Sequence, residues 1–210
     1  MGYHSDTREI AFPLLPDRLD GVLDVGGGYG NTAAALKERF GAKRVGVVDL
    51  VASPEECNPS LDFAMQADLD KSETLDKVCQ EQGPFSVILC MDILEHLKEP
   101  WDCVKTLQSH LSEDGVIIAS IPNVSHLSVV AKLALLGEWR LHDAGIMDRT
   151  HLRFFTKQTA KELLECGGLK VDQVEAITAH HKPFRYINFL KSVIGDRLFA
   201  YQYVMRAGRA

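Results

Sequence analysis

The feature that most constrains this chain is a glycine-rich turn at the end of a short apolar run, VLDVGGGYGN over residues 22–31. A strand that turns through glycines into a helix lets the backbone approach a ligand closely and leaves free N–H groups at the start of the helix. The next segment, TAAALKERF over residues 32–40, has a helical pattern, with Asn31 as a candidate N-cap and Gly41 just past its end. The turn therefore predicts a strand, a ligand-binding loop and a helix in direct succession.

The same alternation of strand and helix continues along the chain. Strands are predicted at 21–25, 44–50, within 61–69, and at 85–90, 115–120, 169–177 and 199–207. Helices are predicted at 32–40, from Ser72 to Gly83, from Pro100 to Leu111, over 125–137, and over 157–166 after a Thr156 cap. Repeated β-α units favour a mainly parallel sheet with helices on both faces and right-handed crossovers.

Two segments stand apart from this alternation. The apolar helix 125–137 is expected to pack in the core, with a lid or a homodimer face as alternatives. The irregular stretch 137–151 is long for a loop in a compact domain, and such loops are usually functional.

Composition and charge exclude several classes of protein. The 210 residues suit one domain, and 46% hydrophobic content is ordinary for a globular protein. A net charge of −6 disfavours a nucleic-acid partner, and the absence of an 18-residue apolar run disfavours membrane insertion. The five cysteines show no C-x-x-C spacing, and His180 and His181 form a pair without further metal-like spacing. No metal site is therefore expected, and we expect a cytoplasmic protein.

The glycines distinguish between two classes of ligand. A dinucleotide site takes G-x-G-x-x-G over a pyrophosphate, but the third glycine position of that motif is Asn31 here. An anionic Asp24 two residues before Gly26 suits a ligand with a positive charge at that point. A nicotinamide oxidoreductase is thus a disfavoured alternative.

LDVGGGYG resembles motif I of the class I S-adenosylmethionine-dependent methyltransferases, in which Gly27 is often cysteine or another small residue. The resemblance implies that the acid lies near the cofactor's amino group, that Asp49 accepts the ribose hydroxyls and that Asp68 lies near the adenine amino group. The implied cofactor-binding residues are Asp24, Gly26, Gly28, Gly30, Asp49, Leu50, Asp68, Leu69 and Met91.

The resemblance extends over nearly the whole chain and implies its architecture. We expect one α/β domain over 1–210, with a Rossmann-like, doubly wound, seven-stranded sheet in the order 3-2-1-4-5-7-6 and strand 7 antiparallel. Residues 1–20 would form an N-terminal cap, with DTREIAFPLLP as one short helix over the cofactor. Residues 121–153 and 178–197 would be insertions on the acceptor side.

Two further stretches carry the candidate chemistry. MDILEHLKEPW (91–101) resembles the segment after strand 4 of many members, and GIMDRTHLRFFT (145–156) resembles a subgroup linked to sugar, polysaccharide and natural-product methylation. An oxygen or nitrogen acceptor loses a proton on methylation, so a base is expected near the methyl group. The candidates are His151, His96 and Asp148, followed by His126 and Asp92; Asn123 is a candidate acceptor contact.

The predicted function is methyl transfer from S-adenosylmethionine to an oxygen or nitrogen of a small molecule, such as a sugar or a related metabolite. A noncatalytic S-adenosylmethionine-binding protein that serves a partner enzyme is the alternative. Arg149 and Arg153 are expected to pair with Asp143 or Asp148 rather than to bind an anionic acceptor.

Overall fold

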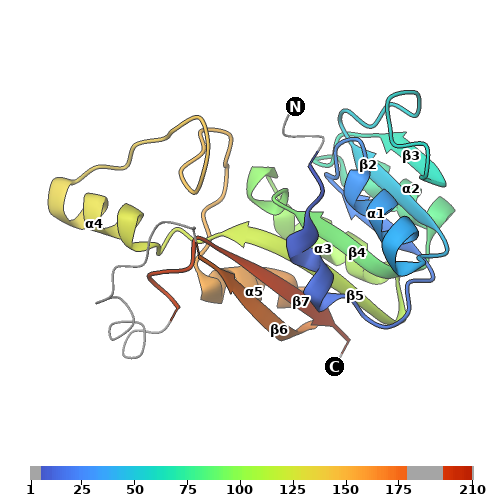
Figure 1. The fold of residues 1–210 in the computed structure, drawn as a ribbon. Helices are drawn as coiled ribbons and strands as arrows, with labels where there is room; N and C mark the ends of the chain where they lie inside the picture. Colours follow the sequence, from blue (N-terminus) through green and yellow to red (C-terminus); the bar gives the residue numbers. More distant parts are fainter. Residues whose placement is uncertain (1–5, 179–195, 210) are drawn as a thin grey trace.

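The computed structural model describes residues 6–178 and 196–209. Its seven-stranded sheet has the order β3-β2-β1-β4-β5-β7-β6, as predicted, with β7 antiparallel to both of its neighbours (Figure 1). The strands are β1 (Val22–Val25), β2 (Val45–Asp49), β3 (Phe63–Gln66), β4 (Phe85–Met91), β5 (Leu111–Pro122), β6 (Lys170–Ile177) and β7 (Gln202–Gly208). Nearly all of the predicted insertion 178–197 lies outside the described residues.

The central strands read as continuous apolar runs because helices cover both faces of the sheet. One face packs against α2 (Ser72–Gln82), α3 (Pro100–Ser109) and α5 (Lys157–Glu165) through residues such as Leu75, Leu107 and Leu163. The other face packs against α1 (Asn31–Phe40) and the 3-10 helix η2 (Glu9–Leu14) through Leu36 and Leu14. The short helix expected in the N-terminal segment is therefore present.

Of the three N-cap residues that the sequence predicted, two differ in the structure. Gly30, with φ of +78°, precedes α1 without a side-chain cap, so the predicted N-cap Asn31 is instead the first residue of the helix. Lys71 takes the N-cap position of α2, which moves Ser72 into the helix. Thr156 caps α5 as predicted, in a reciprocal capping box with Thr159.

The expectation that helix 125–137 packs in the core is wrong. This helix is α4 (Leu127–Leu136), which projects away from the sheet at the left of Figure 1. Val129 is its one buried side chain, whereas Leu135 is 82% exposed. The helix lies beyond the end of β5, and no strand of the described ranges 6–178 and 196–209 covers its outer face. An apolar sequence alone did not reveal this position.

Candidate functional site

The glycine turn lies at the carboxyl end of β1 and takes a backbone path that requires glycine. Gly26, Gly28 and Gly30 have φ of +73°, +57° and +78°, values that side-chain-bearing residues rarely adopt. A Cβ at Gly26 would lie 2.5 Å from Ile93, and one at Gly30 would lie 2.5 Å from Leu61. The loop therefore needs glycine both for its backbone conformation and for its close packing against Ile93 and Leu61, and it lines a small cleft.

Asp24 is buried beneath this loop with one oxygen unpartnered. Its carboxyl accepts a hydrogen bond from the Ala33 backbone in the first turn of α1, but Oδ2 has no partner among the described residues. Burial and, to a smaller extent, the nearby Asp49 carboxylate raise the pKa of Asp24 to about 7, against the lowering effects of the Ala33 hydrogen bond and of Arg8. An unpartnered carboxylate oxygen at the edge of the cleft is a ready partner for a cationic group.

Asp49 connects the ends of two strands through its carboxylate. Oδ2 accepts the Gly28 N–H at 2.8 Å, and Oδ1 accepts the Val51 N–H at 3.0 Å. This carboxylate therefore fixes the glycine loop beside the end of β2, in addition to any contact with a ribose. The adjacent Leu50 is 62% exposed and offers an apolar surface at the same edge.

The remaining predicted cofactor residues have different environments. Asp68 accepts the Asp70 N–H at 3.1 Å and pairs loosely with Lys71 at 3.7 Å, so its carboxylate stays partly accessible. Leu69 is buried in the hydrophobic core. Met91, the last residue of β4, lines the cleft together with the glycine loop.

Arg8 also lines this cleft, and sequence reasoning did not single it out. Its guanidinium lies 3.5 Å from Asp92, and its backbone N–H donates to Thr32 Oγ1 at 3.0 Å. Asp92 in turn accepts the Ser120 hydroxyl at 2.6 Å and has φ of +54°, an unusual value for a residue other than glycine. The segment before η2 is thus fastened across the cleft.

Two of the predicted catalytic residues come together beside the end of β4. The rings of His96 and His151 pack edge to face with centroids 4.8 Å apart. His151 Nε2 lies 4.0 Å from Glu95 Oε1, and the side chain of His151 is 7% exposed. Burial lowers the pKa of His151, which favours the neutral imidazole that can accept a proton.

The resemblance of MDILEHLKEPW to the segment after strand 4 implies that Glu95 lies at the edge of the cleft beside His96, but no chemical role was predicted for Glu95. It lies in the 3-10 helix η3 (Leu94–His96), is 1% exposed, and neither carboxylate oxygen accepts a hydrogen bond from another described residue. Burial raises its pKa well above the usual range, and the Asp92 carboxylate adds to the shift. The sequence signal for Glu95 was its place directly before His96, just after the end of β4. Nothing in one sequence marked that acid as buried.

Other candidates serve the local structure. Asp148 Oδ1 accepts both the N–H and the hydroxyl of Thr150, and these bonds lower the pKa of Asp148. Asn123 is fully buried, and its amide group binds backbone carbonyls near β7, so the predicted acceptor contact is wrong. His126 accepts the Ser128 N–H as the N-cap of α4.

The two arginines of the irregular segment form ion pairs. Arg149 pairs with Asp143, as expected. Arg153 instead pairs with Glu99 at 3.6 Å and donates to the Lys98 carbonyl. The expected partner of Arg153 was wrong because residue 153 lies beside the segment that leads into α3.

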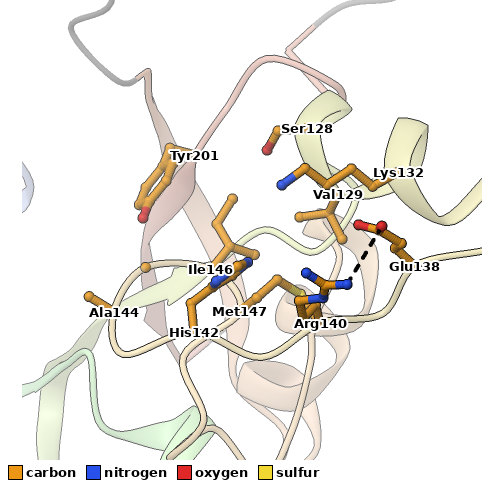
Figure 2. Close-up of a pocket in the computed structure, with 11 residues that line it drawn as sticks. Ser128, Val129, Lys132, Glu138, Arg140, His142, Ala144, Ile146, Met147 and Tyr201 are labelled. Carbon is orange, nitrogen blue, oxygen red and sulfur yellow. Dashed lines mark ion pairs between the residues drawn. The ribbon is translucent and has the colours of Figure 1, made fainter. Parts of the chain in front are cut away.

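A second cavity lies between α4 and the irregular segment (Figure 2). Figure 2 shows an apolar side made by Val129, Ile146 and Met147, with Lys132 and Arg140 at the rim. His151 lies close to the wall of this cavity, because its Nδ1 is 3.1 Å from the carbonyl oxygen of Ile146, which lines the cavity. The part of the chain that the structure describes has no helix long and apolar enough to cross a membrane.

The sheet order and the glycine loop at the carboxyl end of β1 define a Rossmann-like fold of the methyltransferase class. The chain belongs to the methyltransferase-domain family, which it matches over residues 5–174. A solved S-adenosylmethionine-dependent methyltransferase from Archaeoglobus fulgidus has the same fold, with a TM-score of 0.65 and 18% identity over 96% of this chain and 91% of that one. These findings support S-adenosylmethionine as the cofactor.

The relatives found by sequence are aligned over a smaller share of their own length than the Archaeoglobus fulgidus structure is. A ubiquinone biosynthesis O-methyltransferase of Xanthomonas campestris pv. campestris (strain B100) is 32% identical over 106 residues, which are 49% of this chain and 43% of that protein. One from Neisseria meningitidis serogroup C (strain 053442) is 25% identical over 80% of this chain and 74% of that protein. The chain thus matches less than half the length of the first of these relatives.

Proposed function

We propose that this chain transfers a methyl group from S-adenosylmethionine to a hydroxyl oxygen of a small metabolite. The observation that carries the proposal is the unpartnered Oδ2 of Asp24 at the glycine loop, one strand away from the Glu95, His96 and His151 cluster. The cofactor supplies a methyl group already activated on a sulfonium. The protein therefore has to bind, to orient and to manage one proton.

The residues of the cleft fit this cofactor. Asp24 Oδ2 would accept the ammonium of the methionine moiety, and the glycine turn leaves room for close backbone approach. The Asp49 carboxylate, held at the end of β2, would accept the ribose hydroxyls on its remaining lone pairs. Leu50 would lie against the adenine.

The acceptor would occupy the second cavity, which opens between α4 and the irregular segment. Its apolar side suits an acceptor with an apolar or ring-shaped body, and Lys132 suits an anionic group on that acceptor, whereas Arg140 is paired with Glu138 of the same cavity at 3.8 Å. The relatives named O-methyltransferases favour oxygen over nitrogen. The resemblance of residues 145–156 to sugar-related enzymes keeps a sugar hydroxyl among the candidates.

The acceptor's proton would leave at the cluster of Glu95, His96 and His151. His151 lies between the second cavity and Glu95, so an acceptor hydroxyl that reaches from this cavity toward the cleft meets its ring. Asp148 is a weaker base for this role, because two hydrogen bonds from Thr150 to its Oδ1 stabilise the carboxylate and lower its pKa.

The test begins with calorimetric titration of S-adenosylhomocysteine into wild type, Asp24→Asn and Asp114→Asn. Asp24→Asn keeps the shape of the side chain but removes the charge, and a loss of affinity of at least tenfold is expected. Asp114 is an exposed acid near the amino end of β5, whereas the cleft lies at the carboxyl ends of the parallel strands. Its variant is therefore the matched control. Equal affinities of all three proteins would contradict the role of Asp24.

Turnover is then measured as S-adenosylhomocysteine formation with nucleotide sugars and with phenols or catechols that carry a carboxylate. Methylation of a hydroxyl in either panel supports the proposal and identifies the acceptor class. Cofactor binding without turnover on any acceptor would favour the noncatalytic binding protein instead.

A further inference from the structure

Glu95, His96 and His151 each direct one potential ligand atom toward a common point. The three atoms, one carboxylate oxygen and two imidazole nitrogens, lie within 4.8 Å of one another. Ligands of a transition metal bound at about 2.0–2.2 Å lie about 3 to 3.5 Å apart, so small side-chain rotations would bring this set onto an ion. Glu95 and His96 are adjacent in η3, whereas His151 comes from the far end of the irregular segment.

Backbone hydrogen bonds hold both imidazoles in one tautomer. His96 Nδ1 lies 3.2 Å from the Thr150 carbonyl, and His151 Nδ1 lies 3.1 Å from the Ile146 carbonyl. A carbonyl accepts only, so each Nδ1 carries the hydrogen and each Nε2 keeps a lone pair. Metal-binding histidines commonly show this arrangement, in which the second nitrogen donates to a backbone carbonyl and fixes the ring.

The burial of Glu95 is a second and independent observation. Its carboxyl group is almost fully buried, and both oxygens lack a hydrogen-bond partner among the described residues. A buried carboxylate is costly unless it is paired with a cation or coordinates a metal. The carboxylate of Glu95 lies within ion-pair distance of the same His151, whose Nε2 is 4.0 Å from Oε1.

The two segments of the cluster are also fastened to each other. The Glu95 carbonyl accepts the N–H of Leu152 at 2.8 Å and the N–H of Arg153 at 3.0 Å. The backbone on either side of the candidate ligands is therefore held in register, which pre-organises the three side chains.

We propose that Glu95, His96 and His151 bind one divalent transition-metal cation beside the cofactor cleft. Two imidazoles and one carboxylate suit Mn²⁺, Fe²⁺, Co²⁺ or Zn²⁺ better than the all-oxygen sites of Ca²⁺ and Mg²⁺. Three protein ligands would leave coordination positions of the cation open to other ligands. The sequence spacing did not predict a metal, because the ligands become neighbours only through the fold.

The metal would act within the proposed function, on which this role rests. A cation at this point binds the acceptor hydroxyl and lowers its pKa, so that the proton passes to water and the oxygen is left as the nucleophile. His96 and His151 then serve as ligands rather than as bases. An acceptor with two neighbouring oxygens would bind such a cation through both.

The test uses the full chain after treatment with a chelator and desalting. Mn²⁺ is titrated by electron paramagnetic resonance, because this ion prefers oxygen and nitrogen to the thiols of the five cysteines. One saturable Mn²⁺ per chain is expected in wild type, with an affinity at least tenfold lower in Glu95→Gln and in His151→Gln. The matched control is His110→Gln, since His110 pairs with Asp76 at 2.7 Å near the opposite edge of the sheet.

Binding of S-adenosylhomocysteine is measured on the same samples and is expected without added metal. This measurement separates the two proposals: loss of cofactor-product binding by the wild type, or binding without turnover on any acceptor, counts against the proposed function, whereas the Mn²⁺ titration tests the metal site alone. The absence of saturable Mn²⁺ binding, or equal binding in all four proteins, would overturn the metal site. Circular dichroism checks folding; if Glu95→Gln does not fold, the half-buried His96→Gln replaces it with the same expected loss.

Discussion

The carboxyl group of Asp24 occupies the space into which a side chain at Gly27 would project. A Cβ at Gly27 would lie 2.3 Å from Asp24 Cγ and 2.4 Å from Oδ2. Gly27 does not have a positive φ, so the contact alone excludes a side chain there. The family resemblance had suggested only that position 27 holds a small residue. Here the buried acid determines that it is glycine.

Gly27→Ala is therefore expected to displace the Asp24 carboxyl and to weaken S-adenosylhomocysteine binding at least tenfold. Gly208→Ala is the matched control, because a Cβ there meets its nearest atom at 3.4 Å and its φ is also not positive. Calorimetric titration of both variants measures the difference. Wild-type affinity in Gly27→Ala would show that the acid can move without consequence.

The stability of the ligand-free protein should fall as the pH rises from about 4 through about 7. Asp24 keeps its proton in the folded state up to a pKa of about 7, whereas the unfolded chain releases it near pH 4. Since the folded state binds more protons in this window, rising pH favours unfolding, by up to about 1.4 kcal/mol for each pH unit. Asp24→Asn removes this contribution. Urea unfolding of both proteins at pH 5 and pH 8 measures it, and parallel pH profiles would contradict the prediction.

Affinity for S-adenosylhomocysteine should fall as the pH drops below about 7, by at most about tenfold for each unit, because a protonated Asp24 no longer attracts an ammonium. Titration at pH 6, 7 and 8 tests this expectation. The same series on Asp24→Asn should be flatter. A steep dependence in both proteins would assign the proton to another group.

Arg8→Ala is expected to weaken cofactor binding by roughly two- to tenfold, because Arg8 fastens the N-terminal segment to Asp92 across the cleft and a partly buried pair contributes about 1 kcal/mol. Arg18→Ala is the control, since Arg18 is exposed and pairs with Asp20 away from the cleft. Deletion of residues 1–16 should have a larger effect than Arg8→Ala. Unchanged affinity in the deletion would show that the segment does not close over the cofactor.

The exposed apolar face of α4 should contribute little to the stability of the monomer. Leu135→Gln is expected to change the free energy of unfolding by no more than about 0.5 kcal/mol, whereas Leu163→Ala in the core should cost about 2–5 kcal/mol. Urea unfolding of both variants gives the two values. A large loss in Leu135→Gln would show that another surface covers this helix.

The succession of strands and helices was predictable because each strand has a local signal of its own, whereas the full sheet order came from the resemblance to the methyltransferase family. Apolar runs such as FSVILC at 85–90, with glycine or proline at their ends, report burial on both faces without reference to the rest of the chain. Chain order and the crossover rules then leave few topologies. The exposure of α4 was not predictable in this way. An apolar helix has the same pattern whether the surface that covers it belongs to the same chain or not.

The site was predictable only in part, for a related reason. Asp24 and the glycines lie within one short motif, so one sequence places them together. His96 and His151 were each predicted separately, but their ring contact depends on how the irregular segment folds back over η3. Arg8 was missed, and Glu95 was placed at the edge of the cleft without a role, because the importance of both comes from burial and from partners distant in the sequence.

The two bonds from Leu152 and Arg153 to the Glu95 carbonyl hold the chain directly after the irregular segment 137–151, so the two ends of this segment differ in their freedom to change. Residues after 150 are tied to the strand exit that carries the acid, so an insertion or deletion there would disturb both ends of the cluster. Residues 138–145 form the far wall and rim of the second cavity and do not take part in these bonds. Evolution or design could therefore change side chains such as Glu138 and Arg140 on this stretch to alter which molecules enter, while the backbone bonds of His142 and Gly145 to residues 147–149 keep the reactive centre in place.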